Sequence, residues 1–301
     1  MTPDGLITSE FDDAATFDDA VRFDRLADLD GSDLDDGSDE DDWEQEDEED
    51  DDLLDVDLEL VVLALSGTTV FDDGLVELAF KRAARAAGFA ETAEDLSSSL
   101  AYLRETMGQS KISVFRALTG DEDQAQHANA EFEAAYADLA ATTGLREIPG
   151  AEHLIRRLRA SGVKVALTTG FSPPTKDAVL DAVGWRDIAD VALSPAEAGR
   201  GRPYPDLPLT ALLRTGTSSV EGMVVVGDTA SDIISGIAAG AGLVVGVLSG
   251  SHDEETLLAA GADAVIASVA ELPALLGFDE NPETLEALDA AGHDSIAAAG
   301  R

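Results

Sequence analysis

The chain has 301 residues, 45% of them apolar, which suits a mid-sized α/β domain with a smaller domain inserted. It contains no cysteine, so disulfides and thiol chemistry are excluded. Its formal net charge of −43 predicts a surface that repels nucleic acid and anionic membranes, so neither is an expected partner. Neither a leader pattern nor an apolar run of about 18 residues is visible, so we expect a cytoplasmic protein without a membrane span.

Acidic residues are concentrated at the start of the chain. Residues 1–57 hold 26 Asp and Glu against 2 Arg, with few large apolar side chains. Such a composition buries too little apolar surface to fold, so we predict a disordered acidic tail. The favoured interpretation is a solvated appendage. The sharper alternative is a mimic of nucleic acid or a docking segment for a basic partner.

After residue 57 the chain alternates between strand and helix patterns. Short apolar runs predict strands at 59–65, 163–168, 190–193, 223–227, 243–248 and 264–267. Amphipathic runs between them predict helices at 150–161, 173–183, 205–215, 230–240 and 253–260. This alternation favours a Rossmann-like α/β fold, in which helices cover both faces of a parallel sheet. We assign residues 58–74 and 148–278 to this core.

Residues 75–147 interrupt the alternation with helical patterns alone. The predicted helices cover 75–87, 94–106, 111–118 and 124–141. Their place in the chain, after the first strand, predicts an α-helical domain inserted into the core. Residues 279–301 form a peripheral C-terminal tail in this scheme.

Four polar segments lie at or just after predicted strands. They are 64–69 (ALSGTT), 168–170 (TTG), 199–205 (GRGRPYP) and 226–232 (VGDTASD). Ligands of parallel α/β sheets bind at the carboxyl ends of the strands, so we expect these segments to converge on one site.

Two of these segments carry groups suited to a metal ion and to phosphate. Asp228 and Asp232 lie four residues apart where a strand gives way to a helix, and such carboxylates suit Mg²⁺. The alternative for them is an acidic loop with an Asp N-cap. Thr168 offers a hydroxyl and Arg202 a planar guanidinium to a phosphate or phosphonate. Taken singly, each is equally consistent with an ordinary turn threonine or loop arginine.

In this order the four segments resemble the four-motif signature of the haloacid dehalogenase superfamily of phosphohydrolases. Within it, residues 58–278 are most similar to phosphonoacetaldehyde hydrolase and the phosphonatase-like hydrolases, on the strength of 67–70 (GTTV), 168–171 (TTGF) and 199–205. The resemblance implies a Mg²⁺-dependent hydrolase of a small phosphonate or phosphate ester, with residues 75–147 as its cap. It implies that Asp228, Asp232 and the backbone carbonyl of Ser66 bind the metal. It also implies a substrate-binding set of Thr68, Thr69, Thr168, Thr169, Gly170 and Arg202.

Lys111 belongs to a further segment of this kind, in the predicted cap. Residues 107–111 (MGQSK) resemble the phosphonatase segment whose lysine forms a Schiff base with an aldehyde substrate. An imine accepts the electrons released when the bond between carbon and phosphorus breaks. A lysine in this role needs a lowered pKa. The equal alternative is a lysine on the cap surface.

Position 64 departs from the family, because alanine stands where the attacking aspartate is expected. A methyl group neither attacks phosphorus nor binds Mg²⁺, so we predict a catalytically impaired hydrolase. We do not expect Asp72, Asp73 or the Ser66 hydroxyl to replace the missing carboxylate. The alternative function is a non-catalytic protein that binds a phosphorylated or phosphonylated metabolite or docks a partner.

The remaining interpretations concern the histidines and the assembly. The four histidines, at 127, 153, 252 and 293, show no metal-ligand spacing, and we interpret them as structural. A homodimer is one assembly that the sequence leaves open.

Overall fold

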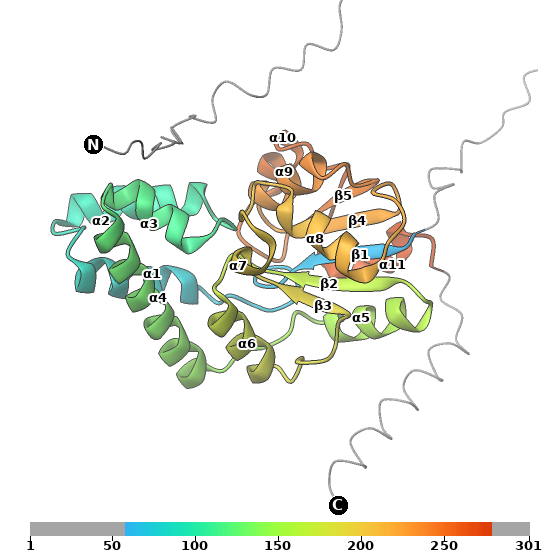
Figure 1. The fold of residues 1–301 in the computed structure, drawn as a ribbon, viewed down its shortest axis with the longest axis horizontal. Helices are drawn as coiled ribbons and strands as arrows, with labels where there is room; N and C mark the ends of the chain where they lie inside the picture. The colour runs from blue at the N-terminus through green and yellow to red at the C-terminus, as the bar shows by residue number, and fades with distance from the viewer. Residues whose placement is uncertain (1–57, 279–301) are drawn as a thin grey trace, which may run out of the picture. The chain divides into compact units, whose positions relative to one another are not determined.

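The computed structural model describes residues 58–278, so the predicted tails at 1–57 and 279–301 lie outside the described residues. The described part contains a six-stranded parallel sheet with the order β3-β2-β1-β4-β5-β6 (Figure 1). The strands are β1 (Leu60–Ala64), β2 (Lys164–Thr168), β3 (Val191–Leu193), β4 (Met223–Gly227), β5 (Leu243–Val247) and β6 (Ala264–Ile266). The predicted α/β fold with a Rossmann-like parallel sheet is therefore confirmed.

β1 lies in the middle of the sheet, and its residues are buried on both faces. Leu60 and Val62 belong to one hydrophobic cluster, whereas Val61 and Leu63 belong to another on the opposite face. This alternation follows from the two-residue period of a strand and explains the uninterrupted apolar sequence. β1 pairs with β2 up to Ala64–Thr168 and with β4 up to Leu63–Val226, so all three strands end at the same edge.

Helices cover both faces of the sheet. One face carries α8 (Asp206–Thr215) and α9 (Ala230–Ala238), and the other carries α5 (Ala151–Ala160) and α6 (Pro173–Ala182). α10 (Glu254–Ala259) connects β5 with β6. All five were predicted within a few residues. The short elements α7 (Pro195–Ala198), η2 (Val269–Glu271) and α11 (Leu272–Leu275) were not, because a single turn shows no hydrophobic period.

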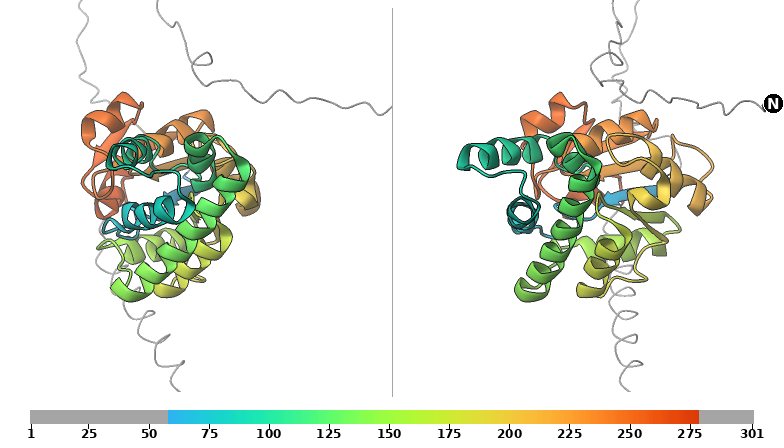
Figure 2. Two further views of the ribbon diagram at one scale, coloured as in Figure 1. Left: turned by 90° about the vertical axis from the view of Figure 1, so that its left-hand side faces the viewer. Right: turned by 60° about the vertical axis from the view of Figure 1, so that its left-hand side comes forward.

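Four helices stand between β1 and β2 in the chain: α1 (Leu75–Ala87), α2 (Ala93–Glu105), α3 (Lys111–Thr119) and α4 (Glu122–Thr143). We call them the helical segment; they lie together beside the carboxyl edge of the sheet (Figure 2). Their core is aromatic: the ring of Phe115 lies 5.5 Å from that of Phe80 and 6.0 Å from that of Phe132. Such pairs contribute about 0.5–1.5 kcal/mol each beyond their buried area.

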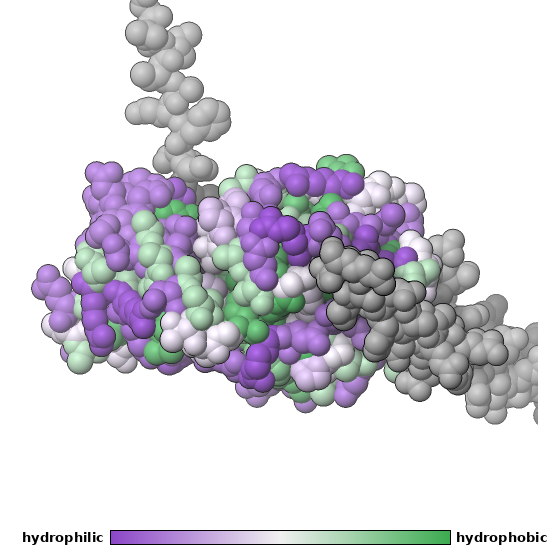
Figure 3. All heavy atoms as spheres, turned by 90° about the horizontal axis from the view of Figure 1, so that it is seen from below, coloured by the Kyte–Doolittle hydropathy of each residue, from purple (hydrophilic) through white to green (hydrophobic). Residues whose placement is uncertain are grey.

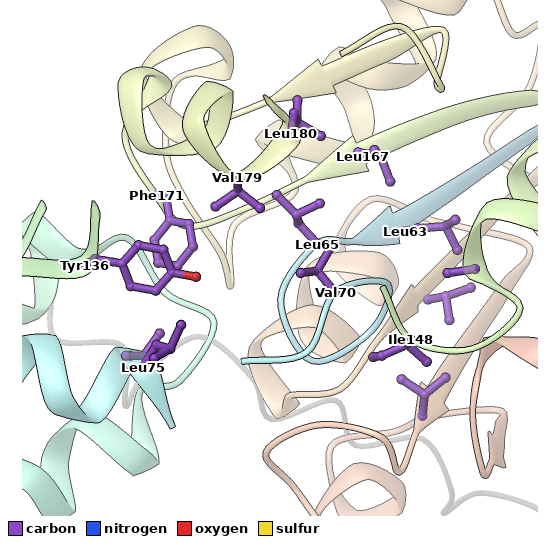
Figure 4. Packing of buried hydrophobic residues seen from close by; sticks show 14 of the residues in the cluster. Leu63, Leu65, Val70, Leu75, Tyr136, Ile148, Leu167, Phe171, Val179 and Leu180 are labelled. Carbon is purple, nitrogen blue, oxygen red and sulfur yellow. The ribbon is translucent and has the colours of Figure 1, made fainter. Parts of the chain in front are cut away.

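The helical segment and the sheet share one hydrophobic contact zone. Tyr136 of α4 lies 4.7 Å, ring centre to ring centre, from Phe171 in the loop after β2. Figure 4 shows Tyr136 and Phe171 side by side, with the tyrosine hydroxyl directed toward the turn that carries Leu65 and Val70. Both aromatic rings are buried, so this packing fixes α4 against the strand ends.

The surface of the described part is largely hydrophilic. On the face in Figure 3, hydrophilic residues alternate with smaller hydrophobic areas. Among residues 58–278, no helix combines the length and apolar character that crossing a membrane requires.

Candidate functional site

The carboxyl ends of β1, β2 and β4 meet around a small cavity of about 40 Å³. Three of the four sequence segments reach it directly, and Arg202 of the fourth completes its wall. The residues from these segments that line the cavity are Ala64, Leu65, Ser66, Gly67, Thr168, Thr169, Arg202, Asp228, Thr229 and Asp232. The predicted convergence is therefore present in the structure.

Asp228 follows β4 and is 2% exposed. Its carboxylate accepts hydrogen bonds from the Thr68 hydroxyl (3.0 Å) and the Ser251 amide (2.9 Å). Two glycines make room for it, because a Cβ on Gly67 or Gly250 would lie 2.2 or 2.0 Å from its Oδ2 atom. Burial and the neighbouring Asp232 charge raise the pKa of Asp228 to about 7.

Asp232 is the centre of a second hydrogen-bonded group in the first turn of α9. With Thr229 it forms a capping box, in which the Thr229 amide donates to Asp232 Oδ2 at 3.2 Å. Asp232 also pairs with Arg202, whose Nε lies 2.7 Å from Oδ1. Both partners of this ion pair are buried, so each needs the other to compensate for lost hydration.

Arg202 joins this group to the end of β2. Its Nη2 donates to the Thr168 hydroxyl at 2.5 Å. Thr168 in turn donates to the Leu63 carbonyl at a longer distance of 3.4 Å. Thr168 and Arg202 thus lie together on the wall of the cavity, where an anion would meet both.

The other predicted substrate-binding residues differ in what they contact. The Thr69 hydroxyl donates to the carbonyls of Ala64 (3.0 Å) and Leu65 (2.9 Å), so its hydrogen bonds stabilise the turn after β1. The Thr169 hydroxyl accepts from the Phe171 amide at 3.2 Å, and this stabilises the next turn.

The end of β1 lacks the polar contacts found at β4. Ala64 is 3% exposed, and its methyl group forms part of the cavity wall. The Ser66 hydroxyl is buried, and its polar neighbour is the Tyr136 hydroxyl of α4. Within residues 58–278, no group of three His, Asp or Glu side chains is placed to hold a metal ion. The two aspartates of the β4 loop are therefore the available carboxylates, and Asp72 does not complete a third position with them.

A larger cavity of about 390 Å³ lies beside the small one, between the helical segment and the loops after β2 and α7. Arg202 lines both. Gly170, Phe171 and Phe132 contribute to its wall, and so does Lys111 at the start of α3. The Lys111 side chain is buried rather than on the surface of the helical segment.

Burial lowers the pKa of Lys111 to about 8, and the nearby Arg202 charge adds to this effect. The Asp72 carboxylate acts in the opposite direction. The Lys111 amine has one hydrogen bond in the described structure, a long one of 3.4 Å to the Gln109 carbonyl. A buried amine with these properties can act as a nucleophile near neutral pH.

The loop between α2 and α3 fits against the core by close backbone contacts. A Cβ on Gly108 would lie 2.4 Å from the Thr229 hydroxyl, and one on Gly170 would lie 2.6 Å from the Gln109 carbonyl oxygen. On the other side of the loop, a Cβ on Gly201 would lie 3.0 Å from the Ser110 Cβ. These three glycines let the loop that carries Lys111 approach the strand ends.

Sequence reasoning missed the Ser251 amide and Gly250, which lie beside Asp228. Both follow β5, outside the recognised segments, and a backbone donor leaves no signal in the residue type. Of the histidines, His127 and His153 are exposed, and His293 lies outside the described residues. The His252 ring accepts a hydrogen bond from the Ala230 amide at 2.9 Å, which fits the predicted structural role.

Comparisons with known proteins agree on one family. A family model described as haloacid dehalogenase-like hydrolase matches residues 58–240. The phosphonoacetaldehyde hydrolase of Bacteroides fragilis is 35% identical over 155 residues, which cover 43% of this chain and 58% of that protein. The matched part thus spans little more than half the length of that relative. The phosphonoacetaldehyde hydrolase of Bacillus thuringiensis is 29% identical over 223 residues, covering 65% of this chain and 78% of that protein.

Solved structures agree on the fold. A hydrolase from Pseudomonas syringae superposes with a TM-score of 0.64 at 24% identity and covers 73% of this chain and 98% of its own. A phosphonoacetaldehyde hydrolase-like protein from Oleispira antarctica gives a TM-score of 0.63 at 24% identity, covering 77% of this chain and 94% of its own. Because the family model matches more than half of the chain, this protein belongs to the haloacid dehalogenase-like hydrolase family, on its phosphonatase-like branch.

Proposed function

We propose that this protein binds a small phosphonate or phosphate ester together with Mg²⁺, and hydrolyses it only slowly because Ala64 replaces the nucleophile. The observation that carries the proposal is the convergence of Thr168, Arg202, Asp228 and Asp232 on one small cavity beside a larger one. The small cavity suits the phosphoryl or phosphonyl group. The larger cavity suits the rest of the molecule.

Thr168 and Arg202 are the groups that would hold the anion. Their mutual hydrogen bond places a hydroxyl and a guanidinium next to each other on one wall. Arg202 is held by its ion pair with Asp232, so the guanidinium is oriented before a ligand arrives. The methyl group of Ala64 leaves this anion site without the repulsion of a third carboxylate.

The oxygen atoms at this site suit Mg²⁺, although they offer two carboxylates rather than three. Asp228, Asp232 and the Ser66 backbone carbonyl would hold the ion, since Mg²⁺ takes oxygen ligands and commonly keeps several waters and substrate oxygens. When bound, the ion would supply charge neutralisation of the phosphoryl oxygens. The raised pKa of Asp228 means that cation binding must displace its proton below about pH 7.

Lys111 is the residue that favours a phosphonate with a carbonyl group as the ligand. Its burial in the larger cavity and its lowered pKa favour a substrate-facing amine over a surface lysine. A carbonyl compound that also carries a phosphonate would reach Lys111 while its anionic group meets Arg202, which borders both cavities. Thr68 supports this site indirectly, through its hydrogen bond to Asp228.

A second candidate is a protein that binds such a metabolite without turnover. The methyl group at position 64 favours it directly, because loss of a nucleophile can reduce a rate by about a millionfold. Both candidates share the same ligand and site. We further propose a cytoplasmic location, with no nucleic acid or membrane as partner, and a homodimer as the assembly to test.

The experiment is thermal unfolding and calorimetry with inorganic phosphate and a small phosphonate, each with Mg²⁺. We expect both anions to raise the melting temperature, since a ligand at 100 times its Kd stabilises by about 2.7 kcal/mol. Arg202→Ala should abolish the shift. Arg186→Ala, a change at an exposed arginine that lines neither cavity, is the matched control and should keep it. Absence of binding at millimolar anion would overturn the proposal.

A further inference from the structure

The larger cavity carries a charge opposite to that of the protein as a whole. The chain holds 62 Asp and Glu against 19 Lys and Arg, a net charge of −43. Of the described residues that line this cavity, Lys111, Arg116, Arg200 and Arg202 are cationic and Glu133 alone is acidic. Basic side chains are therefore concentrated where the proposed ligand would extend beyond its phosphoryl group. Arg116 and Arg200 have no part in the phosphate site described above.

Arg116 is held by a carboxylate that does not belong to the cavity wall. Its Nε donates to Glu122 Oε2 at 2.7 Å, and its Nη2 donates to Oε1 at 2.8 Å. Glu122, in the first turn of α4, lines neither cavity. This bidentate contact uses one edge of the guanidinium plane. The edge between Nη1 and Nη2 remains for another acceptor, because Nη1 forms no hydrogen bond within residues 58–278.

Arg200 is held in a similar way on the wall that the core contributes. Its Nε and Nη2 donate to the Asp206 carboxylate at 3.1 and 2.9 Å. The guanidinium carbon also lies 4.2 Å from the centre of the Tyr204 ring. Tyr204 lines the larger cavity, whereas Asp206 lines neither cavity. The ion pair and the aromatic ring thus orient Arg200 before a ligand arrives, and its Nη1 edge is likewise left for another acceptor.

The segments that carry the two arginines contact each other. A Cβ on Gly201 would lie 3.0 Å from the Cβ of Ser110, the N-cap of the helix that carries Arg116. The side chains of Arg116 and Arg200 are 49% and 61% exposed, whereas that of Arg202 is 7% exposed. Arg202 therefore marks the inner end of the larger cavity, and the other two arginines mark its mouth. A ligand whose phosphoryl group meets Arg202 would direct its far end toward them.

We propose that Arg116 and Arg200 form a second anion-binding subsite, and that the ligand carries two acidic groups: a phosphonate or phosphate at one end and a carboxylate at the other. The inference rests on the proposed function, since it takes the phosphoryl group to be held by Thr168 and Arg202. The larger cavity, with about 390 Å³ against about 40 Å³, has room for a carbon chain between the two groups. A carboxylate matches the planar edge that each guanidinium leaves open.

The experiment is calorimetry on the full chain with Mg²⁺ and straight-chain phosphonates of three to six carbons. The far end of each compound is a carboxylate, a methyl group or an ammonium group. The methyl-ended compound reports on the phosphonate site alone. At the best length we expect the carboxylate-ended compound to bind about three- to tenfold more tightly, which is modest because the arginines are partly exposed. Added salt should reduce this gain, and an ammonium end should give none.

Substitution of the two arginines tests whether they produce the gain. Arg116→Gln and Arg200→Gln should each reduce it, and the double variant should abolish it, with the affinity for the methyl-ended compound unchanged. In Arg200→Gln the backbone amide of residue 200 still donates to Asp206, which keeps the loop in place. Arg186→Gln is the matched control and should keep the whole gain, because this exposed arginine pairs with Asp181 and lines neither cavity.

The converse variants remove the carboxylates and keep the arginines. Glu122→Gln and Asp206→Asn each delete the group that competes for a guanidinium, so the carboxylate gain should stay the same or increase. A fall in the gain would mean that the ion pair, rather than the free edge of the arginine, is what the ligand needs, and would contradict the subsite.

Three results would overturn this inference while leaving the proposed function intact. They are equal affinities for carboxylate-ended and methyl-ended compounds at every length, a carboxylate gain that survives in the double variant, and tighter binding of the ammonium-ended compound. The last result would place the ligand against Glu133 instead. If no phosphonate binds at all, the proposed function itself fails, and this inference fails with it.

Discussion

The ends of β1 and β4 are neighbours in the sheet, yet they differ in how their polar groups are arranged. At β4, each carboxylate is held by several donors: Asp228 by Thr68 and Ser251, and Asp232 by Thr229 and Arg202. At β1, Ala64 presents a methyl group and the Ser66 hydroxyl lies next to the Tyr136 hydroxyl. The two ends face the same cavity.

In the proposed function, this difference separates the groups that bind the ligand from the group that would attack it. The contacts at β4 hold one another in place and involve no atom of residue 64. The proposal therefore implies that ligand binding and turnover can be lost independently.

The largest expected effect is a gain of activity at β1. Ala64→Asp should raise Mg²⁺-dependent phosphate release by about 10³-fold or more, since removing a nucleophile can cost about a millionfold. Phosphate release from phosphonoacetaldehyde and from a panel of phosphate esters measures it. Ala64→Asn is the matched control of equal size, and it should remain as slow as the unchanged protein. Equal rates for the Asp variant and the unchanged protein would show that the missing carboxylate at position 64 does not limit catalysis.

At β4, replacing an aspartate by alanine should lower the stability of the folded protein. Asp232→Ala leaves the buried Arg202 without its partner and removes the capping box of α9. We expect a loss of about 3–5 kcal/mol in the free energy of unfolding, as for other broken buried ion pairs. Denaturant titration measures it. Asp138→Ala, which breaks an exposed pair with Arg82, should change little.

A pH titration gives a third contrast, because Asp228 after β4 is a buried carboxyl group with a raised pKa, whereas residue 64 at the end of β1 is an alanine. The folded protein binds a proton at Asp228 up to about pH 7, whereas the unfolded chain releases it near pH 4. The contribution to stability is therefore complete below about pH 4 and is lost as the pH rises through about 7. Without divalent cations, the melting temperature should fall over this range, and Asp228→Asn should remove that fall. An unchanged pH profile in the Asn variant would contradict the assignment.

The smallest expected effect is at Ser66. Ser66→Ala removes a buried hydroxyl whose polar neighbour is the Tyr136 hydroxyl, so the free energy of unfolding should change by no more than about 1 kcal/mol. Thermal unfolding without ligand measures it. If the free energy of unfolding fell by more than about 1 kcal/mol, the hydroxyl would have a stabilising contact at the end of β1.

The sequence predicted the sheet and the convergence of the site because both follow from short-range patterns. The apolar period placed β1 between two helical layers, and the polar segments after β1, β2 and β4 had to meet once the strands were parallel. The predicted ligand roles of Thr69 and Thr169 remain predictions, although both hydroxyls form hydrogen bonds within their own turns. Residue type alone does not tell a turn-forming hydroxyl from a ligand-facing one.

Contacts between segments that are distant in the chain could not be predicted from the sequence. The burial of Lys111, the amide of Ser251 beside Asp228 and the placement of Asp72 on the wall of the small cavity all depend on how loops pack in space. None of these has a period or a fixed spacing. The short helix α7 was missed for a related reason, since its capping box between Ser194 and Glu197 lies within a single turn.

The close approach of Gly108, Gly170 and Gly201 across the loop that carries Lys111 has a kinetic consequence. At Gly170 the neighbouring atoms are the backbone carbonyls of Gln109 and Gly108, so side-chain rotation cannot widen the structure there. Opening at this point should therefore require the loop to move as a unit, on the microsecond-to-millisecond scale of such motions.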